Sequence, residues 1–563
     1  MKLRILFDAQ ETRYKEPFGT LEPGQQCHLH LHIPVSVGAK KAECVIDPAE
    51  APVCILEKEC TRGDYDIFTG RFSLEKPGLY FYYFRIYKSD GMFRLFKQGH
   101  DTNMEAGDLW QITCTPVDFT TPDWAKGAII YQIFPDRFHK VGDVDLTEKL
   151  TPFSVHKDWN EEVEWLPDKN GIIQNNDFFG GNFRGIAKKM DYIASFGANI
   201  IYLNPICKSF SNHRYDTADY KTPDPMLGTV ADFQDLCQVA HKRGIKIVLD
   251  GVFSHTGARS IYFQSACASV DSPYFSWYTF DRYPDRYNSW WGFDTLPTVN
   301  KMDPSFIKFI IDDADSVIAH WLHLGADGFR LDVADELPDT FIFRLKQRIR
   351  KIRPDALLMG EVWEDASNKI AYGIRRRYFA DGMLDSIMNY PFRSAILDFI
   401  RGYDDGRQFK ETVMTIAENY PPQVLACNMN LLGSHDTARV LTELDGDNNA
   451  LMMASFLQYT LPGSPSIYYG DEAGLQGQKD PFNRRTYPWG QEDPILVEHY
   501  RRLGIMRKKH LPLRLGNIRF LQAENGQLAF CREYGGKQVI VRINRTHELW
   551  DHLPPMGFGI WEE

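Results

Sequence analysis

The chain has 563 residues, too many for one ordinary hydrophobic core, so we expect about three or four units unless a large barrel takes up much of the length. A net charge of −11, from 64 basic and 75 acidic side chains, argues against a nucleic acid or a membrane as partner and favours a neutral substrate. The sequence contains neither a signal-peptide pattern nor a run of about eighteen apolar residues, and its ten cysteines lie singly, so we expect a cytoplasmic chain with free thiols.

Residues 1–120 consist of short segments in which apolar and polar residues alternate, separated by turns. The clearest pair, GLYFYYFRIYK and GMFRLFKQ, is joined by Ser89-Asp90-Gly91, and Asp-Gly between β-rich runs indicates a hairpin. We therefore predict an N-terminal β-sandwich over residues 1–120.

The pattern changes at residue 121, where apolar runs of about six residues begin to alternate with helical stretches. Eight such runs lie at residues 128–134, 199–206, 245–253, 326–333, 356–363, 383–390, 428–436 and 465–472. Strands that are buried on both faces should read as nearly continuous apolar segments, as these do. The economical fold is of the α/β class, a (β/α)8 TIM barrel over residues 121–508.

An insertion at about residues 255–301 separates the third run from the fourth and is too long for a simple βα connection. Its aromatic residues, among them Trp277, Trp290 and Trp291, either line a binding site for sugar rings or form the core of a small subdomain. We expect an inserted domain B here, between strand 3 and helix 3. After residue 508, short runs separated by Asn-Gly and Gly-Gly predict a small C-terminal β-domain over residues 509–563.

Polar residues at the ends of the apolar runs are the candidate site, because a (β/α)8 barrel carries its active site at the C-terminal ends of its strands. These residues are Asp250 and His255 for the third run, Arg330 and Asp332 for the fourth, Glu361 for the fifth, and His435 and Asp436 for the seventh. Each alone is also explained as a cap or a loop hydrogen-bonder. Together they place several carboxylates on one rim, which costs stability and indicates catalysis.

A pair of carboxylates is what glycoside hydrolysis requires, one as nucleophile or base and one as proton donor. Arg330 and Asp332 share one face of their strand, so the arginine is expected to hold Asp332 ionised, although a structural ion pair explains the same pattern. Glu361 is the better acid, because the nearby indole of Trp363 can desolvate it. Metal-assisted hydrolysis is the competing chemistry, but the first run, YQIFPDRF, lacks the His-x-His of barrel metallohydrolases.

Four ordered motifs, DGVFSH, GFRLDVADE, GEVW and LLGSHD, resemble the conserved regions of the α-amylase family, glycoside hydrolase family 13. The resemblance covers essentially the whole chain. It implies Asp332 as nucleophile, Glu361 as general acid/base and Asp436 as the acid that stabilises the transition state. It also implies that Arg330, His255 and His435 complete the subsite, with Tyr215 stacking beneath the reacting ring and Asp216 backing it. From their positions beside these motifs we add Asp250, Val333, Glu336 and Trp363 to the expected substrate-binding set, with Trp363 as a sugar platform and Glu336 on the leaving-group side.

Within the family, the N-terminal β-sandwich, which resembles carbohydrate-binding module family 34, and the valine after Asp332 point to neopullulanases, cyclomaltodextrinases and maltogenic amylases. This subgroup implies a retaining hydrolase of α-1,4 bonds in cyclodextrins, maltooligosaccharides, starch or pullulan, with transglycosylation, and a homodimer. The alternatives are an α-glucosidase or α-1,6-acting enzyme on the same fold, and a non-catalytic glucan-binding relative.

Departures from the family pattern concern calcium. Ser254 and Asn182 stand where asparagine and aspartate are common, and HKVGDVDLTEKL replaces an Asn/Asp-rich loop. Since calcium requires several oxygen ligands, we expect no metal site and no required cofactor, with Asp143 and Asp145 as the remaining candidate ligands for Ca²⁺.

Overall fold

The computed structural model describes residues 4–48, 51–167, 169 and 171–562. The chain forms two compact units. The first comprises residues 1–120, 365–383 and 410–425, and the second comprises residues 121–364, 384–409 and 426–563. All ten cysteines of the chain are free. None of the described helices is long and apolar enough to cross a membrane.

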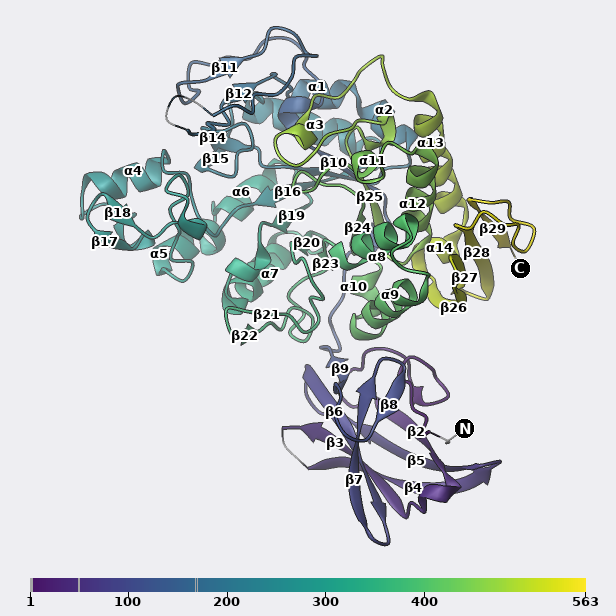
Figure 1. The fold of residues 1–563 in the computed structure, drawn as a ribbon. Coiled ribbons are helices and arrows are strands. Elements are labelled where there is room, and N and C mark those ends of the chain that lie inside the picture. The colour runs from purple at the N-terminus through teal and green to yellow at the C-terminus, as the bar shows by residue number, and fades with distance from the viewer. Residues whose placement is uncertain (1–3, 49–50, 168, 170, 563) are drawn as a thin grey trace. The chain divides into compact units, whose positions relative to one another are not determined.

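The first unit is built on a nine-stranded antiparallel sheet in the order β1-β2-β5-β4-β3-β6-β7-β8, with β9 paired to β6 (Figure 1). The strands are β1 Lys15–Glu16, β2 Gln26–Pro34, β3 Lys41–Asp47, β4 Pro52–Arg62, β5 Tyr65–Ser73, β6 Gly78–Lys88, β7 Gly91–Gln98, β8 Asp101–Asn103 and β9 Trp110–Cys114. The predicted hairpin is confirmed, because Lys88 pairs with Gly91 across the turn.

The core of this sheet is aromatic, with Trp110 stacked on Tyr82 at 5.7 Å and Phe7 packed edge-on against the same indole. The unit also holds a hairpin of β21 (Ile370–Ala371) and β22 (Ile374–Arg375), the part of α9 (Arg407–Asn419) from residue 410 onward, and α10 (Pro422–Leu425).

The second unit contains a closed eight-stranded parallel barrel, as the sequence predicts. Its order is β23-β20-β19-β16-β13-β10-β25-β24, and a parallel bridge between Met388 and Met429 joins the two ends. The strands are β10 Ile130–Ile133, β13 Ile200–Leu203, β16 Lys246–Gly251, β19 Gly328–Leu331, β20 Leu357–Gly360, β23 Ser386–Ile387, β24 Met429–Leu431 and β25 Ser464–Tyr468. Seven of them lie within one of the apolar runs, and β25 begins one residue before the eighth. Nearly all their residues are buried, as strands covered on both faces should be.

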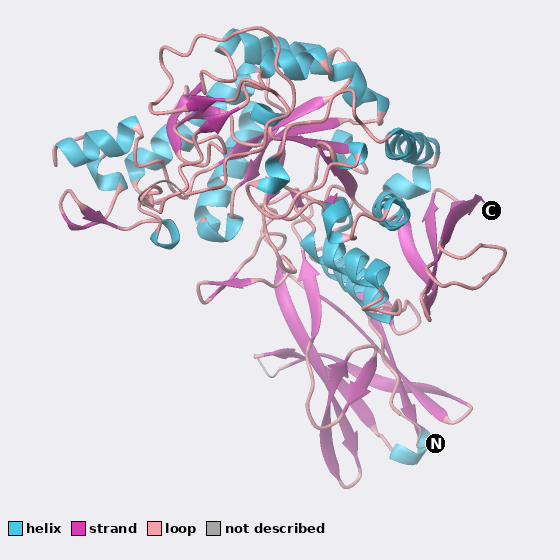
Figure 2. Ribbon diagram, turned by 45° about the horizontal axis from the view of Figure 1, so that its top comes forward, coloured by secondary structure: helices cyan, strands magenta, loops and turns pink. Residues whose placement is uncertain are grey.

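Helices surround these strands (Figure 2). They are α1 Phe183–Lys188, α2 Met190–Ser195, α3 Val230–His241, α6 Val317–Leu324, α7 Asp339–Ile352, α8 Tyr390–Arg401, α11 Val440–Glu443, α12 Asn448–Thr460, α13 Pro494–Lys509 and α14 Leu511–Leu515. Their starts follow local chemistry: Thr229 and Asp232 form a capping box on α3, and Asp493 caps α13 ahead of Pro494.

The predicted insertion follows β16 and is drawn at the left of Figure 1. It contains α4 (Ile261–Ala268), the β17–β18 ladder (Phe280–Arg282 and Arg286–Tyr287) and a single turn at Trp290–Gly292, and α5 (Pro304–Ile307) follows it. Trp277 is only 1% exposed and packs against Tyr274 and Phe306, so it forms the core of this insertion. Trp291, by contrast, is 70% exposed.

A four-stranded antiparallel meander follows α14. Its strands are β26 Asn517–Glu524, β27 Gln527–Tyr534, β28 Lys537–Asn544 and β29 Gly557–Glu562. The two tight turns fall at Asn525-Gly526 and Gly535-Gly536, all four residues having positive φ, which suits the twist of two-residue hairpins. The fourth strand, β29, was not predicted from the sequence.

Candidate active site

The centre of the site is the guanidinium group of Arg330, which is completely buried at the end of β19. Parallel register places Asp250 of β16 beside Arg330, so both side chains point the same way, and their charged groups lie 2.8 Å apart. Asp332, two residues further along, reaches the same Nη1 atom at 3.0 Å. The predicted pairing of Arg330 with Asp332 on one face is thus confirmed.

Arg330 contacts other carboxylates besides that of Asp332. Its Nη2 atom lies 2.7 Å from Oε2 of Glu361, so one cation is shared by three carboxylates. The sequence-based argument that Arg330 holds Asp332 ionised is therefore incomplete, because it leaves out the two other carboxylates that contact the same guanidinium. Burial raises the pKa of Asp332 well above its ordinary value, with Glu361, Asp250 and Asp436 adding to the effect and Arg330 opposing it.

Glu361 is held by donors on both oxygen atoms. The indole Nε1 of Trp363 donates to Oε1 at 3.0 Å, and the backbone N–H of Val333 donates to Oε2 at 2.8 Å. Trp363 thus forms a hydrogen bond with Glu361, where the sequence suggested desolvation only. Val333 adopts φ of 34°, a left-handed conformation that is costly for a β-branched residue, and this strain aims its N–H at Glu361.

Two tyrosines fix the carboxylate of Asp250. Tyr202 of β13 and Tyr215 both donate to its Oδ2 atom, at 2.7 and 2.8 Å. The Tyr215 hydroxyl also accepts from Asn204 Nδ2 at 3.1 Å. The ring of Tyr215 is therefore locked in one position by polar contacts at its far end. The carboxylate of Asp216, which the resemblance places behind this ring, accepts from the backbone N–H groups of Phe210 and Ser211.

His435 is stacked on Tyr215, with ring centroids 5.4 Å apart and an interplanar angle of 9°. Gln132 Nε2 is 3.1 Å from Nδ1, so Nδ1 accepts and the proton of the neutral ring lies on Nε2. Nε2 faces the Tyr215 hydroxyl at 2.5 Å and Asp436 Oδ2 at 3.2 Å. Burial, with the cations Arg330 and Arg484, lowers the pKa of His435 well below its usual value, so the ring stays neutral.

His255 is also neutral, because burial lowers its pKa to about 3. Its Nε2–H donates to the backbone oxygen of Tyr215 at 3.1 Å, and Nδ1 accepts from the Ser254 hydroxyl at 2.9 Å. The loop that carries His255 is held by the Tyr220 hydroxyl, which donates to the backbone oxygens of Val252 and His255 at 2.9 and 3.1 Å.

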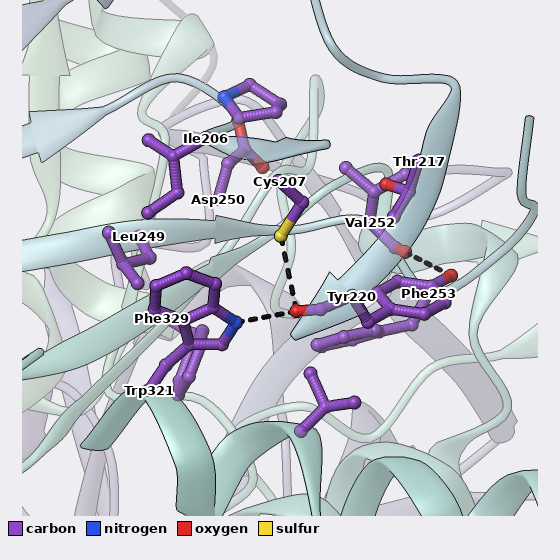
Figure 3. A pocket seen from close by; sticks show the side chains of 12 residues that line it. Ile206, Cys207, Thr217, Tyr220, Leu249, Asp250, Val252, Phe253, Trp321 and Phe329 are labelled. Carbon is purple, nitrogen blue, oxygen red and sulfur yellow. Dashed lines mark hydrogen bonds between the residues drawn. The ribbon is translucent and has the colours of Figure 1, made fainter. Parts of the chain in front are cut away.

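Figure 3 shows how Tyr220 is held beside an internal cavity of about 20 Å³, whose lining includes Asp250 and Phe329. The backbone oxygen of Tyr220 accepts from the indole of Trp321 at 2.8 Å and from the Cys207 thiol at 3.4 Å. A cavity of this size accommodates about one water molecule, so it is a packing feature behind the site and too small for a sugar.

Asp436 completes the carboxylate cluster. Burial and the nearby Glu361 raise its pKa to about 7, against the pull of Arg330 and Arg484. Its side chain is 29% exposed, and Arg484 Nη2 lies 4.0 Å from Oδ1. The carboxylate of Asp250 adds to this rise.

Exposed aromatic rings flank the cluster in two places. Trp363, 46% exposed, stacks on Tyr390 at 3.9 Å and 8° beside Glu361. On the insertion, Trp291 stacks on Trp290 at 4.5 Å and 7°, and Trp290 lies 5.4 Å from the His255 ring. The Trp291 indole donates to Glu336 at 3.2 Å, which ties the insertion to the loop after β19.

Several residues of this network were missed from the sequence: Gln132, Tyr202, Asn204, Tyr390 and Arg484. Gln132 and Asn204 carry a usable signal in the sequence, since each is a polar residue in or directly after an apolar strand. Arg484 lies in the loop after β25 and carries no local signal.

The candidate calcium ligands do not form a set. Asp145 accepts from the backbone and hydroxyl of Thr147, and the fully exposed Asp143 lies 3.9 Å from Lys140. Asn182 is occupied as the N-cap of α1, accepting from Gly185 N at 2.8 Å. Among the described residues, no group of three or more His, Cys, Asp and Glu side chains is placed to hold a metal ion.

Comparison with known proteins agrees with this architecture. The family model "Alpha amylase, catalytic domain" matches residues 132–511. A cyclomaltodextrinase of Geobacillus thermopakistaniensis is 34% identical over 457 residues, which cover 79% of this chain and 73% of that protein. An amylopullulanase of Thermoanaerobacterium saccharolyticum is 34% identical over 628 residues, which cover 96% of this chain and 48% of that protein. The chain spans less than half the length of this and two further amylopullulanases.

Solved structures give the same result. The type III pullulan hydrolase from Thermococcus kodakarensis matches with a TM-score of 0.71 at 27% identity, covering 99% of this chain and 100% of that chain. The cyclic α-maltosyl-(1→6)-maltose hydrolase from Arthrobacter globiformis, in complex with cyclic α-maltosyl-(1→6)-maltose, matches with a TM-score of 0.70 at 29% identity, covering 79% and 100%. The chain therefore belongs to the α-amylase family of glycoside hydrolases.

Proposed function

We propose that the chain cleaves α-1,4-glucosidic bonds of cyclodextrins, maltooligosaccharides, starch or pullulan with retention of configuration, and transfers glycosyl groups to sugar acceptors as well as to water. The single observation that carries this proposal is the shared guanidinium: Arg330 contacts Asp332 with Nη1 and Glu361 with Nη2. It holds two carboxyl groups side by side, as a retaining glycosidase requires.

In the first step, Glu361 gives its proton to the glycosidic oxygen while Asp332 attacks the anomeric carbon, so that the C–O bond to the leaving sugar breaks as a glycosyl ester forms. In the second step, Glu361 takes a proton from water or from an acceptor hydroxyl, whose oxygen displaces Asp332.

The remaining groups position the sugar. The neutral rings of His255 and His435 line the site without adding positive charge, and Asp436 offers acceptors to sugar hydroxyls. Tyr215 presents a fixed aromatic face because its hydroxyl is held by Asp250. Asp250 acts through this tyrosine and through Arg330, so we assign it a positioning role.

Rings beyond the cluster extend the binding surface for the rest of the glucan. Trp363 is held beside Glu361, and Trp291 and Glu336 bridge the insertion to the barrel. Flat indoles that are exposed and fixed in orientation suit the apolar faces of glucose rings. We assign these three residues to the leaving-group side of the cleaved bond.

An α-1,6 activity is the second candidate, because the relatives include amylopullulanases at 34 to 37% identity. Parallel product profiles on β-cyclodextrin, maltose, pullulan and soluble starch distinguish the candidates. Maltose as main product of cyclodextrin and panose from pullulan support the first; maltotriose from pullulan supports α-1,6 cleavage; glucose from maltose supports an α-glucosidase.

The mechanism is tested by Asp332→Ala, which should reduce kcat by several orders of magnitude while the circular dichroism spectrum is unchanged. Activity within about tenfold of the parent would remove the nucleophile assignment, and absence of reducing-sugar release by the parent would favour a non-catalytic relative. A homodimer and a cytoplasmic location complete the proposal, and a monomer in sedimentation at micromolar concentration would exclude the dimer.

A further inference from the structure

Two cysteines face each other on neighbouring strands of the first unit. Cys44 of β3 and Cys54 of β4 are direct partners in the antiparallel register, which shifts only beyond this pair. Residues that are directly opposite in such a ladder have Cα atoms about 4.5 to 5.5 Å apart and side chains on the same face. A disulfide requires Cα atoms about 4.4 to 6.8 Å apart. The pairing of β3 with β4 therefore already meets the backbone requirement for a disulfide.

The sulfur atoms of this pair also meet. The thiol of Cys44, which is completely buried, donates a hydrogen bond to the sulfur of Cys54, which is half-buried. Cys54 packs against the hydrophobic core of the sheet, and Cys44 is part of that core. Both side chains thus lie on the core face of their strands, where one sulfur can reach the other without a movement of the backbone.

The two thiols differ in acidity. The hydrogen bond from the Cys44 thiol, with a second one from the Cys44 backbone N–H, lowers the pKa of Cys54 against the opposing effect of burial. Burial raises the pKa of Cys44 well above its ordinary value, and it raises that of Cys27, in the same core, to about 11. Because the thiolate is the reactive form, Cys54 is the nucleophile of the pair and Cys44 is the second thiol beside it.

A glycine leaves space next to the Cys54 sulfur. Gly70 lies on β5, which pairs with β4 on the side away from β3. A Cβ atom on Gly70 would lie 3.3 Å from Cys54 Sγ and 2.8 Å from the backbone oxygen of Ile55. Since glycine has no side chain, it does not cover this sulfur, and an oxidant as small as hydrogen peroxide can approach it.

We propose that Cys44 and Cys54 form a redox-active dithiol, which a peroxide converts reversibly into a cross-strand disulfide. The Cys54 thiolate attacks one peroxide oxygen, the O–O bond breaks, and a sulfenic acid and hydroxide form. The Cys44 sulfur then attacks the Cys54 sulfur, and its proton leaves with the sulfenic hydroxyl group as water while the S–S bond forms. The two cysteines lose two electrons, which the peroxide gains. The disulfide protects Cys54 from irreversible oxidation to sulfinic and sulfonic acid.

The test is to treat the full chain with excess hydrogen peroxide, remove the peroxide with catalase, block the remaining thiols with N-ethylmaleimide and map the peptides by mass spectrometry without reductant. Cys44→Ser and Cys54→Ser are treated in the same way. The matched control is Cys60→Ser, because Cys60 is also half-buried on β4 but its cross-strand partner is Ile67. Unchanged circular dichroism spectra show that the variants are folded.

The parent and Cys60→Ser should yield a Cys44–Cys54 linked peptide, lighter by about 2 Da than the sum of its two free peptides, and dithiothreitol should restore both thiols. Cys44→Ser should carry Cys54 as sulfinic or sulfonic acid, because no second thiol condenses with the sulfenic acid. In Cys54→Ser, Cys44 should stay reduced. A parent without this linked peptide, a parent in which Cys54 is linked to Cys27 instead, or a folded Cys44→Ser variant in which Cys54 stays reduced overturns the proposal.

Discussion

Replacing Asp436 with asparagine should stabilise the protein while it removes activity. In the folded chain the carboxyl group of Asp436 has a pKa of about 7, whereas in an unfolded chain an aspartate titrates near 3.9. The folded state thus binds this proton more tightly than the unfolded state. Its stability therefore falls as pH rises from about 4 to about 7, and the loss is complete above pH 7. The amide of an asparagine at this position does not titrate, so the variant does not lose this stability as the pH rises.

The magnitude follows from the difference of about three pKa units, which corresponds to about 4 kcal/mol as an upper limit. Since 29% of the Asp436 side chain reaches solvent and its proton is shared with neighbouring carboxyl groups, we expect a gain of about 1 to 2 kcal/mol at pH 8. At pH 5 the gain should be about one third as large, because only the unfolded state has lost its proton there.

Thermal denaturation at pH 8 and pH 5, followed by tryptophan fluorescence, measures this difference. Asp480→Asn is the matched control, because Asp480 pairs with the same arginine, Arg484, at 3.1 Å but is 45% exposed. Losing that exposed pair should cost about 0 to 1 kcal/mol at either pH. If Asp436→Asn lowers the melting temperature, or raises it equally at both pH values, the reasoning about this carboxyl group is wrong.

Three further predictions follow from the same contacts. Trp291→Ala should raise KM for maltoheptaose about tenfold and leave kcat within about twofold, whereas Trp561→Ala, on the C-terminal sheet, should change neither. Tyr220→Phe should lower the free energy of unfolding by about 1 kcal/mol and lower kcat, because the loop that carries His255 loses its support; an unchanged kcat would show that the hydroxyl only stabilises the fold. Dialysis against a chelator should leave activity and melting temperature unchanged, because Asp143, Asp145 and Asn182 are separately engaged; restoration of lost activity by Ca²⁺ alone would contradict this.

The barrel was predictable because its strands are short, apolar and separated by regular helices. Each of the eight runs proved to hold a barrel strand, and the polar residues at their ends point into one cluster around Arg330. The alternation of side chains along β19 was enough to place Arg330 beside Asp332.

Contacts that depend on packing between distant segments were not predictable. Periodicity shows that Arg330 and Asp332 share a face, but it does not show that Glu361 shares the same cation. The strained backbone of Val333 and the proton position on His435 likewise arise from tertiary contacts. For the aromatic insertion, composition alone did not decide whether the tryptophans bind sugar rings or form a core. Their burial shows that Trp277 belongs to the core and that Trp291 is exposed.

The central claim is that Asp332 forms the bond to the sugar while Glu361 moves the proton. It is tested most directly in a Glu361→Gln variant incubated with an α-maltosyl fluoride, whose fluoride leaves without needing a proton. Mass spectrometry of the acid-quenched protein should find a maltosyl adduct on the peptide that contains Asp332. An adduct on Asp250 or Asp436, or none while the fluoride is still hydrolysed, would contradict the account.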